Sequence, residues 1–261
     1  MKSQVLKIVK IGSSILSDRA VLQGFLKDFS SLTGLKVLVH GGGQHATELA
    51  EQLNVKVRMV DGRRITCEDT LEIITMSYAG RINKDIVAQL QGMDCNAMGF
   101  TGADGNLIEA IKRPPSPIDF GFVGDVIAVN RVLLNQLLGL EITPVFCALT
   151  HDSNGTLLNT NADTIASELA LNLASSYKTE LYYCFDQPGV MESLDDPDSL
   201  ISEIDPESFE KMKKKKQVSD GMIPKLDNCM HALKHNVDKI FIGNHNLLKP
   251  EFETFTTIHK G

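Results

Sequence analysis

The stretch VLVHGGGQHATELAEQL (residues 37–53) passes from an apolar strand through three consecutive glycines into a helical pattern. Residues 35–40 are almost entirely apolar, which is typical of a strand buried on both faces. Beyond the glycines, apolar residues recur at helical spacing and form one face of a helix, made by Ala46, Leu49, Ala50 and Leu53. A turn needs one glycine or two. Three predict that another group comes so close to the backbone that a Cβ would be in the way.

The chain contains a second junction of this kind. Residues 4–11 predict a strand, Gly12-Ser13-Ser14 a turn, and residues 18–32 a helix. Such junctions direct backbone N–H groups and the positive end of a helix toward an anion. Either junction alone is explained equally well by a tight turn into a helix. Two on successive strands are more informative, because neighbouring parallel strands place both turns at one edge of the sheet, where open α/β folds bind ligands.

The rest of the chain alternates between strand and helix patterns. Asp61-Gly62, inside VKVRMVDGRRIT (residues 55–66), predicts a β-hairpin. The alternation predicts an α/β fold, a three-layer sandwich with a largely parallel central sheet and helices on both faces. The other expected elements are a long helix with apolar positions Leu71, Ile74, Tyr78, Ile82, Ile86 and Leu90, helices at 162–174 and 225–236, strands at 95–98, 107–111, 142–148, 180–185 and 238–243, and a surface excursion at 192–218.

Composition limits the class of protein. The chain has 261 residues, enough for one large α/β domain or two fused lobes, and its 43% of hydrophobic residues is ordinary for a globular protein. A net charge of −7 argues against nucleic acid or an anionic membrane as the main partner. Five cysteines without a CxxC pair predict free thiols in a reducing cytoplasm. The sequence contains no GxxxxGK[ST], GxGxxG, GxSxG or HExxH motif, which argues against a Walker-type NTPase, a dinucleotide-binding fold, an esterase and a zinc protease.

Two basic residues stand out by their positions. Lys10 ends an apolar strand just before a glycine turn, where its ammonium must reach water or an anion. An edge lysine that extends to solvent and a cation directed at phosphate are equally good interpretations. Arg64 follows the hairpin turn beside Arg63. An exposed arginine pair is usually only a solvated surface, and a carboxylate-binding arginine is the more specific alternative.

Polar residues later in the chain allow similar alternatives. Asn159, Asn161 and Asp163 precede an apolar helix, where one of them suffices as a cap and the surplus indicates a site. The run Lys213–Lys216 is interpreted as a solvated loop. Lys225 differs, because it follows DGMIP and opens a helix. Two histidines near the three glycines, His40 and His45, are interpreted as capping or packing residues.

In order along the chain, these motifs resemble those of the amino acid kinase family. The similar segments cover most of the chain and are VKIGSSIL, LVHGGGQ, DGRRIT, GFTGADGNLI, GFVGDVIAVN, LNTNADTIA and SDGMIPKL. The sequence departs from the family pattern at Ser13, where a second glycine is usual, and at Phe185, where a small hydroxyl residue is common.

The resemblance implies roles for particular residues. Lys10 would contact the transferred phosphoryl group, Lys225 the leaving oxygens of ADP, and Asp163 both lysines. Substrate would be bound by backbone N–H groups of Gly42 and Gly43, by Arg64 at its α-carboxylate, and by Asn159 at its acylamino end. The nucleotide would be lined by Gly12, Ser13, Asp186, Gln187, Pro188, Gly189, Val190, Met191, Gln217, Val218 and Ser219.

The resemblance also implies a reaction: ATP-dependent phosphorylation of the γ-carboxylate of an N-acylated L-glutamate, first of all N-acetyl-L-glutamate, in arginine biosynthesis. ATP and Mg²⁺ would be required, with Mg²⁺ held mainly by the nucleotide phosphates and no protein ligand named. Residues 1–175 would form a substrate-binding, dimer-forming lobe and residues 176–261 a nucleotide-binding lobe. Alternatives are a carbamate, uridylate or aspartate kinase-like enzyme, or a nonenzymatic metabolite sensor on this fold.

The resemblance implies that relatives inhibited by arginine carry an extra N-terminal helix that builds a hexamer. Here the first strand is expected within a few residues of Met1, so the expected assembly is a homodimer without arginine feedback. The expected location is the cytoplasm. The helix near 66–91 is the expected dimer contact. No nucleic acid or membrane partner is expected.

Overall fold

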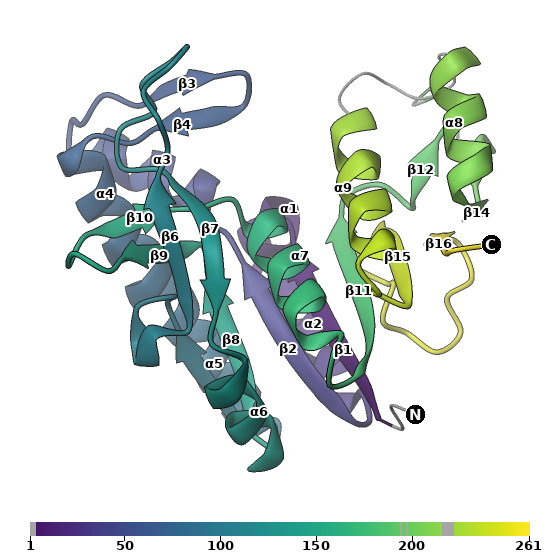
Figure 1. Ribbon diagram of the computed structural model, residues 1–261. Helices are drawn as coiled ribbons and strands as arrows, with labels where there is room; N and C mark the ends of the chain where they lie inside the picture. The colour runs from purple at the N-terminus through teal and green to yellow at the C-terminus, as the bar shows by residue number, and fades with distance from the viewer. Residues whose placement is uncertain (1–3, 194, 197, 216–221) are drawn as a thin grey trace. The chain divides into compact units, whose positions relative to one another are not determined.

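The computed structural model describes residues 4–193, 195–196, 198–215 and 222–261. Within it the chain forms two compact units (Figure 1). The first comprises residues 1–36 and 169–261, and the second residues 37–168. The proposed division by function into residues 1–175 and 176–261 stays a prediction.

The first unit is built on a mainly parallel sheet in the order β14-β16-β15-β11-β1. Strands β1, β11 and β15 run parallel, while β16 is antiparallel to β15. Leu6, Ile8 and Leu181 are fully buried, as the apolar strand patterns predicted. The elements of this unit are β1 (Val5–Ile11), α1 (Ser13–Ser17), α2 (Arg19–Ser31), β11 (Lys178–Phe185), β12 (Val190–Met191), β13 (Leu200–Ile201), β14 (Glu203–Ile204), α8 (Pro206–Lys215), α9 (Ile223–Lys234), β15 (Lys239–Asn244) and β16 (Thr256–Ile258).

The second unit contains a parallel sheet in the order β2-β8-β5, a four-stranded sheet in the order β10-β9-β6-β7, and the β3–β4 hairpin at one end (Figure 1). Two elements, β2 and α7, have residues in both units. The elements are β2 (Leu35–His40), α3 (Gly43–Gln52), β3 (Arg58–Val60), β4 (Arg63–Ile65), α4 (Glu68–Ile74), η1 (Thr75–Ile82), α5 (Asn83–Gln91), β5 (Ala97–Phe100), η2 (Asp104–Asn106), β6 (Ile108–Lys112), β7 (Gly124–Val129), α6 (Arg131–Gly139), β8 (Thr143–Cys147), β9 (Leu149–Asp152), β10 (Leu157–Asn159) and α7 (Ala162–Leu173).

The structure confirms the predicted α/β class with a mostly parallel sheet and helices. It also contains features that the sequence did not predict. The four-stranded sheet is one of them. Another is η1, a π-helical stretch inside the long helix that runs from α4 to α5. Leu53 is 51% exposed and leaves the apolar face of α3, because the helix ends at Gln52.

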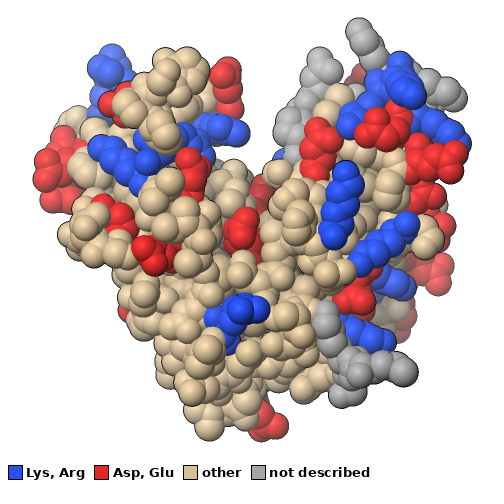
Figure 2. Space-filling model, in the orientation of Figure 1, with Lys and Arg blue, Asp and Glu red and all other residues tan. Residues whose placement is uncertain are grey.

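The region 192–218 and its lysine run also differ from expectation. Residues 206–215 form helix α8, so the lysines that the structure describes there belong to a helix and not to a loop. Phe209 is 2% exposed and anchors that helix. Lys213 is half-buried and Lys214 exposed, so the surface interpretation holds for the lysines of the run whose side chains the structure describes. Lys211 and Lys213 pair with Glu207 and Glu210 on the same helix, and Figure 2 shows both signs of charge interspersed over α8.

Candidate active site

The glycine turn lies between β2 and α3 in the second unit. A Cβ placed on Gly42 would come within 2.6 Å of Ile82 Cδ1 and 2.7 Å of Tyr78 Cδ1, so the group that excludes a side chain there is helix η1. At Gly43 the nearest atoms, Arg64 Nη2 and the Tyr78 hydroxyl, would be 3.9 Å from such a Cβ. The close approach predicted from three glycines is therefore explained at Gly42 by packing within the protein.

Arg64 is held beside this turn. It lies on β4, is 9% exposed, and donates from Nη2 to Gly43 O at 2.8 Å and to Thr47 Oγ1 at 2.8 Å. Its other terminal nitrogen, Nη1, is buried and has no hydrogen-bond partner among the described residues. Arg63, the preceding residue, is exposed. The two arginines therefore differ: Arg63 is exposed, whereas Arg64 is buried beside the glycine turn with Nη1 unpaired among the described residues.

The three polar residues at and before the start of α7 occupy different positions and make different contacts. Asn161 caps the helix, because its Oδ1 accepts from the N–H of Asp163 at 2.7 Å. Asn159, on β10, donates to Thr66 Oγ1 at 3.0 Å. That contact joins Asn159 to the base of the hairpin strand that carries Arg64. Asp163 lies in the first turn of α7.

Lys10 and the residues of the first turn lie in the first unit. Lys10 is half-buried and stands opposite Tyr183 of β11. The N–H of Gly12 donates to Cys184 O at 2.8 Å, so this donor is engaged within the protein. Ser13 begins the short helix α1 and is exposed.

Lys225 lies near the carboxyl end of β11. Its Nζ is 4.5 Å from the centroid of the Phe185 ring, a cation–π distance. Because β1 and β11 are parallel neighbours, Lys10 and Phe185 both stand at the carboxyl edge of the sheet, and Lys225 lies against Phe185. The structure therefore brings both predicted lysines to one edge of the first unit.

The predicted nucleotide residues after β11 have different exposures. Asp186 is exposed and accepts a 3.5 Å hydrogen bond from Ser14 Oγ, and Gln187 and Pro188 are half-buried. Gly189, Val190 and Met191 are buried, and the N–H of Val190 donates to Thr256 Oγ1 at 2.8 Å. Gln217, Val218 and Ser219 lie outside the described residues.

Sequence reasoning missed Thr47 and Tyr78. Thr47 is one helical turn after Gly43 and donates to its carbonyl at 2.9 Å, while it accepts from Arg64. Tyr78 is 5% exposed. Burial raises the pKa of its phenol, and the nearby charge of Arg64 acts in the opposite direction. A threonine four residues after a glycine turn, and a tyrosine in an aliphatic helix face, were the available signals.

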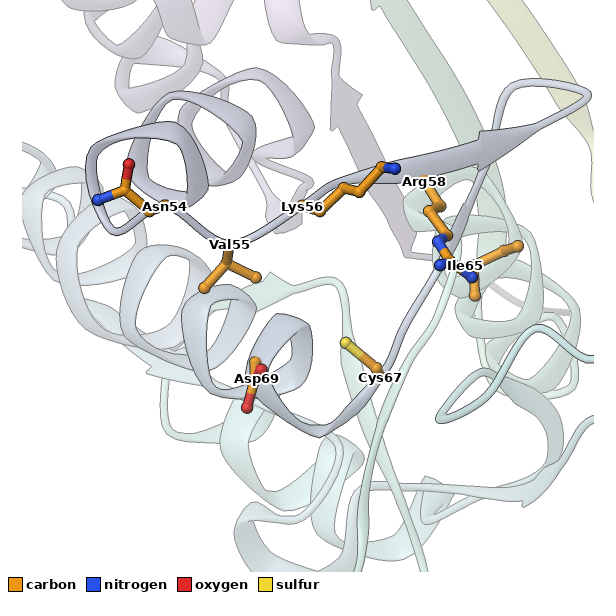
Figure 3. A pocket seen from close by; sticks show the side chains of 7 residues that line it. All are labelled: Asn54, Val55, Lys56, Arg58, Ile65, Cys67 and Asp69. Carbon is orange, nitrogen blue, oxygen red and sulfur yellow. The ribbon is translucent and has the colours of Figure 1, made fainter.

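A cavity of about 400 Å³ is lined in part by the hairpin (Figure 3). Residues from the segment after α3, from both hairpin strands and from the start of α4 line it: Asn54, Val55, Lys56, Arg58, Ile65, Cys67 and Asp69. A hydrogen bond with Thr70, at 3.1 Å, lowers the pKa of the Cys67 thiol. Burial raises the pKa of the Cys147 thiol to about 12.

Among the described residues, no cluster of three or more His, Cys, Asp or Glu side chains has metal-binding geometry. The described helices include none that is both long enough and apolar enough to cross a membrane. The five cysteines, all described, form no disulfide.

Comparisons with known proteins agree on one family. Residues 6–244 match the model of the amino acid kinase family. The chain is 51% identical over 240 residues to the acetylglutamate kinase of Cytophaga hutchinsonii, which covers 92% of this chain and 91% of the relative. It is 48% identical over 237 residues to the acetylglutamate kinase of Phocaeicola vulgatus, with 91% and 92% covered.

A solved structure supports the same fold. The protein smu.665 of Streptococcus mutans superposes with a TM-score of 0.80 at 22% identity, over 98% of this chain and 99% of that one. Together with the glycine turn, the buried arginine beside it and the two lysines at one sheet edge, the match over residues 6–244 places this chain in the amino acid kinase family.

Proposed function

We propose that this chain transfers the γ-phosphoryl group of ATP to the γ-carboxylate of N-acetyl-L-glutamate, a step of arginine biosynthesis. The relatives at 45–51% identity over about 92% of the chain are acetylglutamate kinases. The observation that carries the proposal is Arg64. In its buried guanidinium, Nη2 donates to Gly43 O and Thr47 Oγ1, and Nη1 has no hydrogen-bond partner among the described residues. A carboxylate oxygen suits Nη1, because an ionised acceptor makes a strong, charge-assisted hydrogen bond with a guanidinium N–H.

The reaction needs charge neutralisation more than proton transfer. A γ-carboxylate is ionised at neutral pH and attacks phosphorus without a general base. The obstacle is the approach of two anions, so catalysis is mostly positioning and electrostatic stabilisation. Lys10 would contact the phosphoryl group in transfer and Lys225 the leaving oxygens of ADP. Gly42 and Gly43 would offer N–H groups to the substrate and the γ-phosphate.

The remaining roles complete the proposal. Asn159 would bind the acylamino end of the substrate, and Asp163 would orient the two lysines. Gly12, Ser13, residues 186–191 and residues 217–219 would line the nucleotide. At Gly12 we expect van der Waals contact only, since its N–H is bonded to Cys184 O.

Mg²⁺, held mainly by the nucleotide phosphates, would neutralise part of their charge and align them. The product is an acyl phosphate, a mixed anhydride that water hydrolyses. Closure of the β3–β4 hairpin over the substrate would keep water away from it.

A coupled assay of ADP release tests the reaction. The panel contains N-acetyl- and N-succinyl-L-glutamate, carbamate, UMP and L-aspartate, each with ATP and Mg²⁺. We expect ADP release that depends on an N-acyl-L-glutamate. Turnover with carbamate, UMP or aspartate instead would assign the chain to another branch of the family, and the absence of turnover with every acceptor would favour a sensor.

The two lysines are tested by Lys10→Ala and Lys225→Ala. We expect each change to lower kcat by about a hundredfold or more, because each removes charge from the transition state. Lys214→Ala, at an exposed lysine of α8, is the matched control. Near-normal turnover in a folded Lys10 or Lys225 variant would remove that residue from the mechanism.

We also propose a homodimer in the cytoplasm, with the helix from α4 to α5 at its contact. Met76 on η1 is 51% exposed, an apolar side chain suited to an interface. Light scattering should give twice the mass of the 28.6 kDa chain. A monomer or a hexamer would contradict this assembly, and a dimer that survives Met76→Glu would place the contact elsewhere.

A further inference from the structure

His40 ends β2 immediately before the glycine turn and is fully buried. Both of its ring nitrogens have neighbours. Nδ1 lies 2.8 Å from Gly41 O, and Nε2 lies 3.1 Å from Nδ2 of Asn83. A carbonyl oxygen only accepts hydrogen bonds, so Nδ1 carries the proton and donates to Gly41.

The orientation of the Asn83 amide determines the state of Nε2. Asn83 is 1% exposed, and its Nδ2 also donates to Val145 O at 3.0 Å, while its Oδ1 accepts from Lys84 Nζ at 3.2 Å. Turning the amide round would place oxygen against a carbonyl and nitrogen against an ammonium. The amide therefore presents an N–H to His40, and Nε2 accepts it. An imidazole that donates at Nδ1 and accepts at Nε2 is neutral.

Burial keeps the ring in this state. Desolvation is the main cause that lowers the pKa of His40 to about 4, the hydrogen bond to Gly41 opposes it, and the charge of Lys84 lowers the pKa further. A proton on Nε2 would also face the N–H of Asn83. At neutral pH His40 is thus a fixed hydrogen-bond donor and takes no part in proton transfer.

The contact with Gly41 sets the direction of the next N–H. The peptide between Gly41 and Gly42 is planar and trans, so its C=O and N–H point in opposite directions. Holding Gly41 O toward His40 therefore turns the N–H of Gly42 away from the imidazole. Tyr78 and Ile82 fill the space in which a side chain of residue 42 would lie. The same helix therefore holds the turn at two points: Ile82 packs against Gly42, and the next residue, Asn83, holds His40.

We propose that His40, oriented by Asn83, is a positioning residue that holds the glycine turn in the conformation that presents the N–H groups of Gly42 and Gly43 to the reacting anions. This inference rests on the proposed function for the use made of those N–H groups, and on the contacts above for the conformation of the turn.

NMR of the protein labelled with ¹⁵N at histidine tests the first part. His40 should give the signals of a neutral Nδ1–H imidazole, unchanged between about pH 8 and pH 6, and the signals are assigned by their loss in His40→Asn. A neutral Nε2–H imidazole, or titration in this range, would contradict the proposal. This measurement does not depend on enzymatic activity.

Kinetics of two variants test the second part. His40→Leu keeps most of the volume and removes the donor, whereas the amide nitrogen of His40→Asn takes a position close to that of Nδ1 and donates to Gly41. We expect kcat to fall by about tenfold or more in His40→Leu and to stay within about threefold in His40→Asn, because misdirected N–H donors lose transition-state stabilisation. Rates are measured well below each variant's thermal transition and per folded protein.

A purely structural role predicts another outcome. Normal kcat in folded His40→Leu, or equal losses in both variants, would overturn the positioning role. Thr143→Val is the matched control: it removes another buried side-chain hydrogen bond of the same unit, to Cys95, and should lower the thermal midpoint without changing kcat.

Gly99→Ala keeps the proposal testable should His40→Leu fail to fold. A Cβ on Gly99 would collide with Asn83 Oδ1, displacing the amide from a strand remote from the turn. We expect the same loss of kcat and shifted His40 signals. Unchanged signals with normal kcat would contradict the role of Asn83. If the wild type turns over no acylglutamate, the proposed function fails, and the inference is then decided by the NMR measurement.

Discussion

The hydrogen-bond contacts of Arg64 are the main structural reason to expect a substrate with a carboxylate. Three elements converge on it: α3 supplies Thr47, the turn supplies Gly43 O, and η1 supplies Tyr78. Their contacts leave Nη1 of the guanidinium without a hydrogen-bond partner among the described residues. A carboxylate oxygen fits Nη1 while Nη2 keeps its own contacts, and the compact ammonium of a lysine does not reproduce both sets of donors.

Arg64→Lys tests this geometry. We expect KM for N-acetyl-L-glutamate to rise by about tenfold or more while KM for ATP changes little, since one ammonium cannot keep the contacts with Gly43 and Thr47 and also bind the carboxylate as the guanidinium does. Arg63→Lys, at the exposed neighbour on the same strand, is the control and should leave both constants unchanged. An unchanged acceptor KM in Arg64→Lys would show that the carboxylate binds elsewhere.

Phe185, where the family pattern has a small hydroxyl residue, places an aromatic ring against Lys225. Its ring lies under the ammonium of Lys225. Cation–π contacts at exposed sites are worth about 0.5–1 kcal/mol. We expect Phe185→Leu to lower kcat about threefold to fivefold without a change in acceptor KM, and Phe185→Tyr to retain activity because it keeps the ring. Equal rates for the leucine and tyrosine variants would mean that the ring does not orient Lys225.

Among elements, the β3–β4 hairpin connects the cavity of Figure 3 with the candidate substrate site. Cys67, at the start of α4, faces this cavity, whereas Ile65 reaches it from the hairpin strand that carries Arg64. A bulky group on Cys67 would therefore restrict the hairpin without touching Arg64.

Thiol labelling tests the coupling. At about pH 7.5, a maleimide should react with Cys67 well before the four buried cysteines, since the thiolate reacts, and the Thr70 contact lowers the pKa of Cys67 while burial raises that of Cys147. We expect the adduct to raise KM for the acylglutamate. Cys67→Ser should prevent labelling and keep its activity in the presence of maleimide. A labelled enzyme with normal KM would show that the hairpin moves independently of the cavity.

Local patterns predicted most elements for physical reasons that do not depend on the rest of the chain. The parallel strands are apolar on both faces, and Asp61-Gly62 adopts the positive φ angles of a hairpin turn, 48° and 72°. The four-stranded sheet was missed because two of its strands, β9 and β10, have four residues or fewer and too little alternation to be distinguished from loops. The π-helical stretch has no local signature in the sequence, since it depends on what the helix packs against.

At the scale of the whole molecule, the buried neutral His40 links stability to pH. Its pKa is about 4 in the folded chain and about 6.5 when unfolded. The unfolded chain therefore binds a proton as pH falls through 6.5 while the folded chain does not, so stability is complete above that pH and declines down to about pH 4. Between pH 7.5 and pH 5 this group should cost about 2 kcal/mol of unfolding free energy.

Urea denaturation at the two pH values measures this effect. His40→Asn lacks the titrating group, so its loss of stability between pH 7.5 and pH 5 should be smaller than that of the wild type by about the same 2 kcal/mol. Carboxylates that titrate in this range contribute equally to both proteins and cancel in the comparison. If the wild type and His40→Asn show the same pH dependence, the pKa of His40 is the same in the folded and the unfolded chain, and the ring is protonated at pH 5 in both.

The sequence by itself determined the class of fold, the positions of the glycine turns, the hairpin and the polar residues before α7, because backbone preferences and hydrophobic periodicity act over a few neighbouring residues. The resemblance of ordered motifs added the family. Only the tertiary structure decided which of several candidate residues are engaged: Asn161 as the helix cap, Gly12 bonded to Cys184, Arg64 buried and Arg63 exposed. It alone revealed that Gly42 makes room for a helix and that His40 is held by Asn83. These contacts join residues some forty positions apart, and their energies depend on burial and on the direction of hydrogen bonds, which no local pattern of residues specifies.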